Sequence, residues 1–277
     1  MLWQTSRFQL DLSRPHIMGI VNVTPDSFSD GGQHQGTAGA LAHAERLLSE
    51  GADILDIGGE STRPGSPAVD LDEELARVLP VVREAVKWGV PLSVDTYKPE
   101  VMAEVLALGA DIINDIWALR QPGALEVVAA HPSCGVCLMH MHRDPQSMQL
   151  APMAGEVVAP VCAFLSERAQ TVLAQGVSAS RVALDPGIGF GKTVDQNFAL
   201  LRDQARLGAL GYPVLAGWSR KSALGAVTGQ TLAHERVSAS VAAALIAVQH
   251  GAQVVRVHDV RASADALRVW AAVQAQA

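Results

Sequence analysis

Three planar hydrogen-bonding side chains lie within or directly after short apolar runs of the chain. They are Asp95, Asn114 and Asp185. A carboxylate can accept two parallel N–H bonds, and a carboxamide can both donate and accept. We therefore expect these three side chains to bind the edge of a flat nitrogen heterocycle.

A second set of side chains at similar places consists of donors and cations. Its members are Thr62, Arg63, Arg220, Arg256 and His258. Hydroxyl, guanidinium and imidazole groups all donate to phosphate oxygens. Some could instead cap a following helix, and Arg256 could pair with a neighbouring aspartate. If both sets share one rim, they predict a substrate in which a heterocycle is joined to a phosphate ester.

The elements that must position these residues form a regular alternation. Eight short apolar, β-branched runs are typical of parallel strands buried on both faces: Ile17–Val23, Ile54–Ile57, Leu92–Val94, Ile112–Ile116, Val136–Met141, Val182–Leu184, Val214–Ala216 and Val254–Val257. Eight helix-like stretches alternate with them: Gly39–Ser49, Leu71–Lys87, Glu100–Leu108, Gly123–Ala130, Gly155–Ala174, Gln196–Leu207, His234–Gln249 and Ser263–Gln274.

This alternation predicts the α/β class and a (β/α)8 barrel, the TIM-barrel architecture, in which polar residues at the carboxyl ends of the strands share one rim. Since no linker or low-complexity stretch divides the chain, we expect residues 1–277 to form a single domain.

Composition narrows the classes of function. The chain of 277 residues is 49% hydrophobic and 18% charged, so it can bury a large core. A net charge of −7 disfavours nucleic acid and anionic membranes as partners. The longest apolar run has about ten residues, whereas a membrane-spanning helix needs roughly 20. With no signal-peptide pattern and three cysteines that cannot all pair, we expect a cytoplasmic protein.

Two other patterns in the sequence suggest a phosphate-binding loop and a metal site, but neither fits. The stretch 185–193 is superficially similar to a phosphate-binding loop, but Pro186 stands where that pattern needs its first glycine. Its glycines more simply let the backbone pass close to a ligand. Cys134 and Cys137 precede His140 and His142, a spacing similar to that of some metal sites. On a strand Cys137 and the two histidines face opposite sides, which disfavours zinc.

Seven segments along the chain resemble the signatures of the dihydropteroate synthases, a pterin-binding family. They follow one another in order: Ile17–Gly32, Gly51–Ser66, Ser93–Thr96, Asp111–Asp115, Asp185–Lys192, Gly217–Ser222 and Val255–Asp259. The long ones are highly specific. The resemblance implies a (β/α)8 transferase of folate biosynthesis. Such an enzyme joins 4-aminobenzoate to 6-hydroxymethyl-7,8-dihydropterin pyrophosphate, giving 7,8-dihydropteroate and pyrophosphate, with Mg²⁺ present.

The resemblance also implies a role for each matching residue. The pterin would contact Asp95, Asn114, Asp185 and Lys221, and Met139 would also be a substrate-binding residue. The pyrophosphate would contact Thr62, Arg63, Arg220, Arg256 and His258, with Asn22 near the Mg²⁺. The aminobenzoate would be bordered by Thr62, Pro64, Phe190, Lys221 and Ser222. The loops Thr24–Gln35 and Ser61–Val69 would close over the site and bring Phe28 and Asp30 inward. The expected catalytic residues are Asp95, Asp185, Lys221, Arg256 and His258, and a homodimer through His234–Gln249 is expected.

The expected chemistry needs no side-chain nucleophile. Loss of pyrophosphate from the pterin methylene leaves a delocalised cation, which fixed carboxylates stabilise while Arg, His and Mg²⁺ stabilise the leaving group. Two alternatives stay open at this point. One is a domain that presents methyltetrahydrofolate to a corrinoid methyltransferase, although it has no use for a pyrophosphate site. The other is a catalytically silent binding or scaffold protein.

Overall fold

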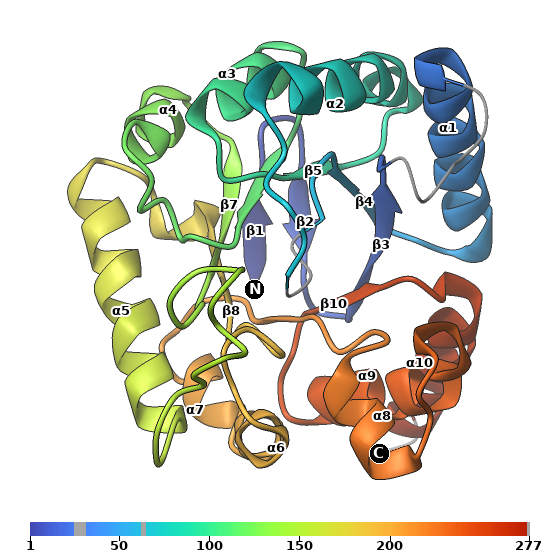
Figure 1. Cartoon of the computed structure of the whole chain (residues 1–277), viewed down its shortest axis with the longest axis vertical. Coiled ribbons are helices and arrows are strands. Elements are labelled where there is room, and N and C mark those ends of the chain that lie inside the picture. The colour runs from blue at the N-terminus through green and yellow to red at the C-terminus, as the bar shows by residue number, and fades with distance from the viewer. Residues whose placement is uncertain (25–31, 62–64, 276–277) are drawn as a thin grey trace.

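Eight parallel strands enclosed by helices form the body of the computed structural model, which describes residues 1–24, 32–61 and 65–275 (Figure 1). The strands are β3 (His16–Asn22), β4 (Ile54–Gly58), β5 (Leu92–Asp95), β6 (Ile112–Asp115), β7 (Gly135–Met139), β8 (Val182–Asp185), β9 (Leu215–Ala216) and β10 (Val254–Val257). Their order is β8-β7-β6-β5-β4-β3-β10-β9. A parallel bridge between Leu184 of β8 and Val214, the residue before β9, joins the two ends of this order and closes the barrel. The predicted (β/α)8 barrel is thus confirmed.

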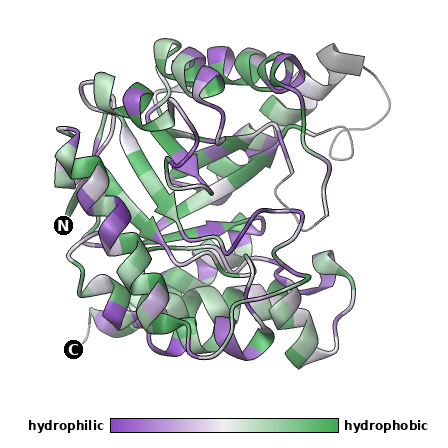
Figure 2. Cartoon of the chain, turned by 60° about the vertical axis from the view of Figure 1, so that its left-hand side comes forward, coloured by the Kyte–Doolittle hydropathy of each residue, from purple (hydrophilic) through white to green (hydrophobic). Residues whose placement is uncertain are grey.

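Helices cover the outside of the barrel. They are α1 (Gly32–Glu50), α2 (Leu71–Ala85), α3 (Pro99–Ala107), α4 (Ala124–Ala130), α5 (Val158–Ala174), α6 (Val194–Arg202), α7 (Ala205–Gly208), α8 (Ser222–Thr228), α9 (Val237–Gln249) and α10 (Val260–Gln274). Figure 2 shows hydrophobic residues along the strands and mixed faces on the helices. Some helix starts follow local rules: Pro99 opens α3, and Thr193 with Gln196 forms a capping box at α6.

Alternate residues of each strand face opposite sides, and this sorts the core into two parts. Leu55, Ile113 and Val255 belong to the large core between strands and helices, whereas Ile54 and Ile112 belong to a smaller cluster inside the barrel. The side chain two residues further along each strand therefore also faces inward. This period of two decides which polar residues meet above the inner apolar cluster.

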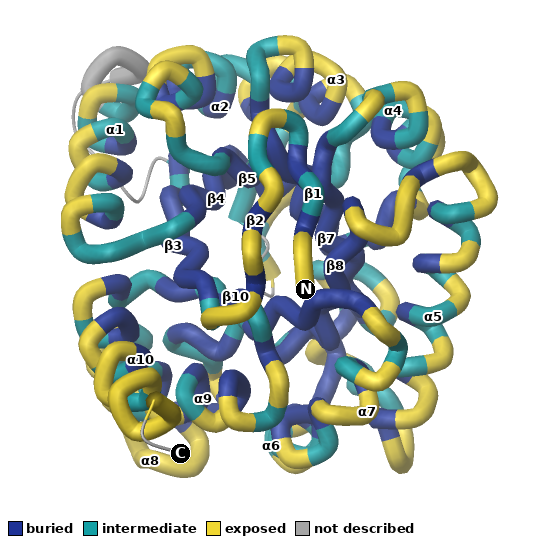
Figure 3. The backbone as a smooth tube through the Cα atoms, turned by 180° about the vertical axis from the view of Figure 1, so that it is seen from behind, coloured by how far each residue is buried: buried dark blue, intermediate teal, exposed yellow. Residues whose placement is uncertain are grey.

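An N-terminal hairpin, which the sequence did not predict, covers the end of the barrel where the strands begin, opposite their carboxyl ends. Strands β1 (Leu2–Gln4) and β2 (Gln9–Asp11) pair antiparallel and cross that end in the rear view of Figure 3. Trp3 is fully buried in the inner cluster, and its indole N–H donates to the carbonyl oxygen of Arg181 at 2.9 Å. Three-residue strands carry too little periodicity to be read from sequence.

One helical prediction needs correction, and one helix was not predicted. The stretch Gln196–Leu207 is divided between α6 and α7, because the chain leaves the helix at Asp203. Helix α8 was not predicted, since its seven residues follow directly on the polar rim. Among the described helices, none is long and apolar enough to cross a membrane.

Candidate active site

A layer of polar side chains lies inside the barrel, above the apolar floor. Asp56, Asp95, Asn114, Asp185 and Arg256 come from five different strands, β4, β5, β6, β8 and β10. Asp56, Asn114 and Asp185 each come two residues after a member of the inner apolar cluster, so they face the same interior. Asp95, Asn114 and Asp185, predicted to form one acceptor set, therefore lie at the carboxyl end of one barrel.

Arg256 binds two aspartates of this layer, and one of them also contacts Asn114. Its Nε donates to Asp56 Oδ2 at 2.6 Å, and its Nη2 donates to Asp95 Oδ2 at 2.7 Å. Asn114 donates its Nδ2–H to the same Asp56 oxygen at 3.2 Å. This bond uses one N–H of the Asn114 amide and leaves its carbonyl oxygen available as an acceptor. Arg256 thus does pair with neighbouring aspartates, as one interpretation of the sequence allowed.

The charges in this layer influence one another strongly. Burial raises the pKa of Asp95 to about 7, an effect that Arg256 opposes and the negative charge of Asp56 strengthens. Burial disfavours the cation on Arg256, yet Asp56 and Asp95 raise its pKa above the ordinary value. One guanidinium thus stands between two carboxylates. With all three groups ionised their net charge is −1, which suits a substrate that develops positive charge.

Asp185 sits where β8 turns into the loop before α6. Its Oδ1 accepts the Gly187 N–H at 2.6 Å. Burial raises the pKa of the Asp185 carboxyl, while that hydrogen bond and the nearby cations Lys221 and Lys192 oppose the rise. One carboxylate oxygen is thereby fixed by the backbone, and the group is held in one orientation at the end of its strand.

The loop after Asp185 is held by a buried lysine. Lys192 Nζ donates to the carbonyl oxygens of His140, Gly187 and Phe190 at 3.2, 2.8 and 3.2 Å. Burial lowers the pKa of Lys192 to about 7. Gly187 has φ +68°, and a Cβ there would lie 1.9 Å from the His140 carbonyl oxygen. The close approach that requires this glycine is therefore to the chain after β7, whereas the sequence interpretation proposed an approach to a ligand.

An apolar wall borders the polar layer. Met139 and Phe190 belong to one buried cluster with Ile116, Met141 and Met148. Lys221 Nζ lies 4.5 Å from the centroid of the Phe190 ring, a cation–π distance. Ser222 follows as the first residue of α8. The structure thus brings Lys221 and Phe190, both predicted to border the substrates, into contact.

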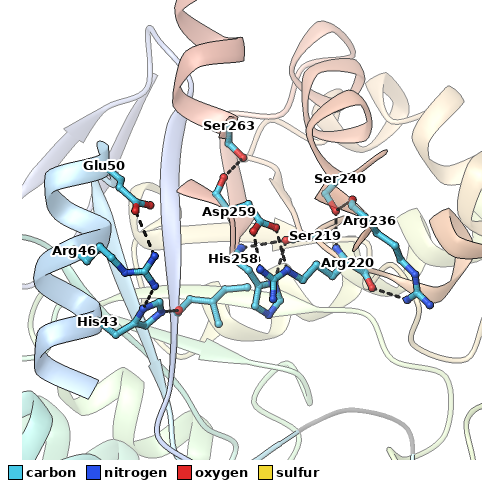
Figure 4. A network of polar contacts seen from close by, with 11 residues as sticks. His43, Arg46, Glu50, Ser219, Arg220, Arg236, Ser240, His258, Asp259 and Ser263 are labelled. Atoms are coloured by element: carbon cyan, nitrogen blue, oxygen red, sulfur yellow. Dashed lines mark hydrogen bonds and ion pairs between the residues drawn. The ribbon is translucent and has the colours of Figure 1, made fainter. Parts of the chain in front are cut away.

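Two further predicted donors, Arg220 and His258, lie at a cavity of about 720 Å³ on the rim. Asn22, Arg220 and His258 line it together with His43 and Arg46 of α1. Arg220 forms a two-bond ion pair with Asp259, at 3.0 and 2.6 Å, and the His258 N–H and Nδ1 both lie 3.0 Å from Ser219 Oγ (Figure 4). The predicted phosphate-binding set is therefore divided between the barrel interior, where Arg256 lies, and this cavity.

Comparison with known proteins decides the family. The sequence profile of the family described as "Pterin binding enzyme" matches residues 18–258. The dihydropteroate synthase of Neisseria meningitidis serogroup B is 53% identical over 277 residues, covering 98% of this chain and 97% of that protein. The Escherichia coli enzyme of the same name is 48% identical over 261 residues, covering 94% and 92%. The chain belongs to the dihydropteroate synthases of the pterin-binding enzyme family.

Solved structures of this family agree with that assignment. A Xanthomonas albilineans dihydropteroate synthase with 4-aminobenzoic acid superposes with a TM-score of 0.93 at 53% identity, covering 99% of each chain. A Burkholderia cenocepacia dihydropteroate synthase complexed with 7,8-dihydropteroate gives a TM-score of 0.90 at 52% identity, covering 99% and 97%. These relatives favour the transferase over the corrinoid-linked and scaffold alternatives.

Five predicted residues of the synthase site lie outside the residues that the structure describes. They are Thr62, Arg63 and Pro64, predicted to contact the pyrophosphate or aminobenzoate, together with Phe28 and Asp30.

Two residues of the synthase barrel escaped the sequence analysis. Asp56 was missed because it lies in the middle of its strand, whereas functional side chains were expected only near the carboxyl ends of the strands. The signal was present, since Asp56 is a charged residue at an inward position of an apolar strand. Its Oδ1 is buried and has no hydrogen-bond partner among the described residues. Lys192 was quoted in a motif but given no role, and only the tertiary fold reveals its three carbonyl partners.

The cysteine–histidine pattern is split as its strand period predicted. Cys137 belongs to the apolar cluster inside the barrel. His140 instead packs edge-on against Phe164 of α5, with ring centroids 5.0 Å apart. Cys134 Sγ accepts a hydrogen bond from Arg181 at 3.1 Å. Within the described residues these side chains point to different parts of the fold.

Proposed function

We propose that the polar layer and the adjoining cavity together bind 6-hydroxymethyl-7,8-dihydropterin pyrophosphate and condense it with 4-aminobenzoate. The products are 7,8-dihydropteroate and pyrophosphate. The observation that carries this proposal is the convergence of Asp95, Asn114 and Asp185 beside a cavity lined by Arg220 and His258. It matches a substrate whose flat, N–H-rich end and anionic end are a few bonds apart.

In this proposal the carboxylates recognise the pterin and favour its ionisation. Asp185 and Asp95 accept N–H bonds from the heterocycle, and Asn114 offers its carbonyl oxygen. As the bond between the methylene carbon and the phosphate oxygen breaks, the pterin gains positive charge. Fixed negative groups stabilise that charge more in the transition state than in the ground state, which lowers the barrier.

The donors act at the other end of the breaking bond. Arg220 and His258 would contact the diphosphate, and Arg256 would act from the pterin side of the same bond. A neutral arylamine held over Phe190 and Lys221 then attacks the methylene carbon and loses one proton. Positioning replaces a side-chain nucleophile in this scheme.

The Asn22 oxygen fits a supporting role for Mg²⁺. Mg²⁺ usually keeps several waters and binds few protein oxygens together with the substrate's phosphates. Asn22 offers one hard oxygen on the wall shared with Arg220 and His258. When bound, Mg²⁺ would supply positive charge to the diphosphate. Asn22 would hold it on the cavity side of the barrel.

The proposal extends to assembly and location. Val227, Leu232 and Ile246 are exposed apolar side chains on or beside α8 and α9, with 59%, 52% and 39% of their surface accessible. Exposed apolar groups gathered on neighbouring elements favour association. They support a homodimer through α9, and we propose that this homodimer acts in the cytoplasm. Light scattering in solution should give twice the monomer mass of 29.2 kDa.

Product analysis tests the reaction directly. Purified protein with Mg²⁺ and both substrates should release pyrophosphate and dihydropteroate in equal amounts. Omission of 4-aminobenzoate should abolish dihydropteroate formation. Sustained pyrophosphate release at the full rate without the arylamine would indicate a hydrolase, and no release with both substrates would refute the proposal.

A further inference from the structure

The corner between β9 and α8 has an unusual backbone. Arg220 adopts φ +60°, in the left-handed region that residues other than glycine rarely enter. The neighbours of Arg220 in the chain contact predicted site residues: Ser219 contacts His258, and Lys221 lies against Phe190. The direction in which Lys221 leaves the corner therefore depends on keeping Arg220 in this conformation.

Two residues of α9 and its N-cap bind both sides of that backbone. The Arg220 N–H donates to Ser240 Oγ at 2.8 Å, and Arg236 Nη1 donates to the Arg220 carbonyl oxygen at 2.9 Å. Ser240 Oγ in turn donates to the Arg236 carbonyl oxygen at 2.6 Å. Figure 4 shows this closed set of bonds beside the Arg220–Asp259 ion pair. The polar backbone groups of the strained residue are thus satisfied by α9.

Arg236 is itself fixed by the chain that connects α8 to α9. Its Nε donates to the Gln230 carbonyl oxygen at 2.9 Å, and its Nη2 donates to that of Thr231. Gly225 leaves the room that this requires, because a Cβ there would lie 2.6 Å from Arg236 Nε. The guanidinium therefore binds three carbonyl oxygens and ties the connection to the corner.

We propose that Arg236 and Ser240 are positioning residues for the transferase reaction. By holding Arg220 in its left-handed conformation, they set where the Lys221 ammonium enters the pterin pocket, whereas the Arg220 guanidinium is held separately by Asp259. Neither side chain lines the cavity described above. This inference rests on the proposed function, because its effect is measured through Lys221.

A double-mutant cycle separates positioning from general stabilisation. The variants are Ser240→Ala, Lys221→Ala and their combination, with kcat/KM for the pterin pyrophosphate as the readout. Ser240→Ala should lower kcat/KM at least about tenfold in the wild-type background and by less than about threefold when Lys221 is absent. An equal factor in both backgrounds, or no loss in the wild-type background, would overturn the proposal.

Ser263→Ala is the matched control. Ser263 is also a buried helical serine, and it donates to the carbonyl oxygen four residues before it, that of Asp259, at 2.9 Å. It does not contact the Arg220 backbone, so its removal should leave kcat/KM within about twofold of wild type. A loss as large as that of Ser240→Ala would show that the effect is unspecific and would also overturn the proposal.

Arg236→Lys provides a second test if Ser240→Ala unfolds. The lysine keeps the positive charge but cannot donate to three carbonyl oxygens in the fixed geometry of a guanidinium. Its loss of kcat/KM should again depend on Lys221. Inactivity of the wild-type protein would count against the proposed function, whereas an active wild type with additive variants counts against positioning alone.

Discussion

Arg256 of β10 and Asp95 of β5 form an ion pair of 2.7 Å inside the barrel, although two strands lie between theirs. The same guanidinium binds Asp56, whose side chain is completely buried. Breaking a buried pair by removing one partner leaves an uncompensated charge, which costs far more than losing a surface salt bridge. Arg256 therefore affects both the charge of the pocket and its stability.

Replacement of Arg256 should separate these two effects. Arg256→Ala should lower kcat/KM at least about a hundredfold, or roughly 2.7 kcal/mol, because it removes charge stabilisation from the transition state. It should also destabilise the fold by about 3–5 kcal/mol, as expected for a broken buried ion pair. Steady-state kinetics and denaturant unfolding measure the two quantities.

Arg256→Lys keeps the positive charge and distinguishes whether Arg256 acts on the pterin or on the diphosphate of the substrate. If Arg256 acts on the leaving group, the affinity for a pterin without diphosphate should stay close to that of wild type. A loss of this affinity as severe as the loss of activity would instead place Arg256 in the pterin half of the site.

The pH dependence of pterin binding should report Asp95. Because burial raises its pKa to about 7, the carboxylate takes up a proton as the pH falls through that value. A protonated Asp95 loses the charge that strengthens its N–H bonds, so pterin affinity should decrease from about pH 8 to about pH 6. Calorimetric titrations across this range measure it. In Asp95→Asn that dependence should be weaker, and an unchanged dependence would assign the titration to another group.

The raised pKa also has a consequence for stability. The unfolded chain releases the Asp95 proton near the ordinary carboxyl pKa of 3.8, while burial in the folded chain raises that pKa to about 7. The folded state binds more protons between these values, so the contribution of Asp95 to the free energy of unfolding falls as the pH rises through this window.

The N-terminal hairpin should stabilise the barrel from the end opposite the site. Trp3→Ala removes a fully buried side chain from the inner cluster and should cost about 3–5 kcal/mol of unfolding free energy. The neighbouring Leu2 is 52% exposed, and Leu2→Ala should cost less than about 0.5 kcal/mol. Denaturant unfolding compares the two. Equal costs would mean that the hairpin is not part of the core.

Residues whose signal is local in the sequence could be predicted, whereas contacts set by the tertiary fold could not. Asp95, Asn114 and Asp185 could be found because Asp95 and Asp185 are the last residues of their strands and Asn114 is the last but one, and the carboxyl ends of barrel strands must share a rim. Asp56 could have been predicted only by following the alternation of inward and outward side chains back into its strand. The strands of the β1–β2 hairpin are shorter than any pattern that periodicity can resolve.

Partner choice among charged residues could not be predicted. Arg220 was assigned to phosphate from its type alone, and in the structure its guanidinium pairs with Asp259. Arg256 was expected at the pyrophosphate and is bound by two aspartates. Each of these contacts joins residues at least 39 positions apart, so only the closed barrel determines them.

Pterin binding by Asp185 tests the central claim, that the polar layer inside the barrel is the pterin site. Asp185→Asn retains an oxygen for the Gly187 N–H but loses the charged acceptor, a contact worth about 1.5–3 kcal/mol. Calorimetry with a pterin that lacks diphosphate should show affinity reduced at least about tenfold, equal to 1.4 kcal/mol, with thermal stability nearly unchanged. Asp203→Asn, at the partly exposed C-cap of α6, should bind like wild type. Unchanged affinity in Asp185→Asn would contradict the account and place the pterin elsewhere.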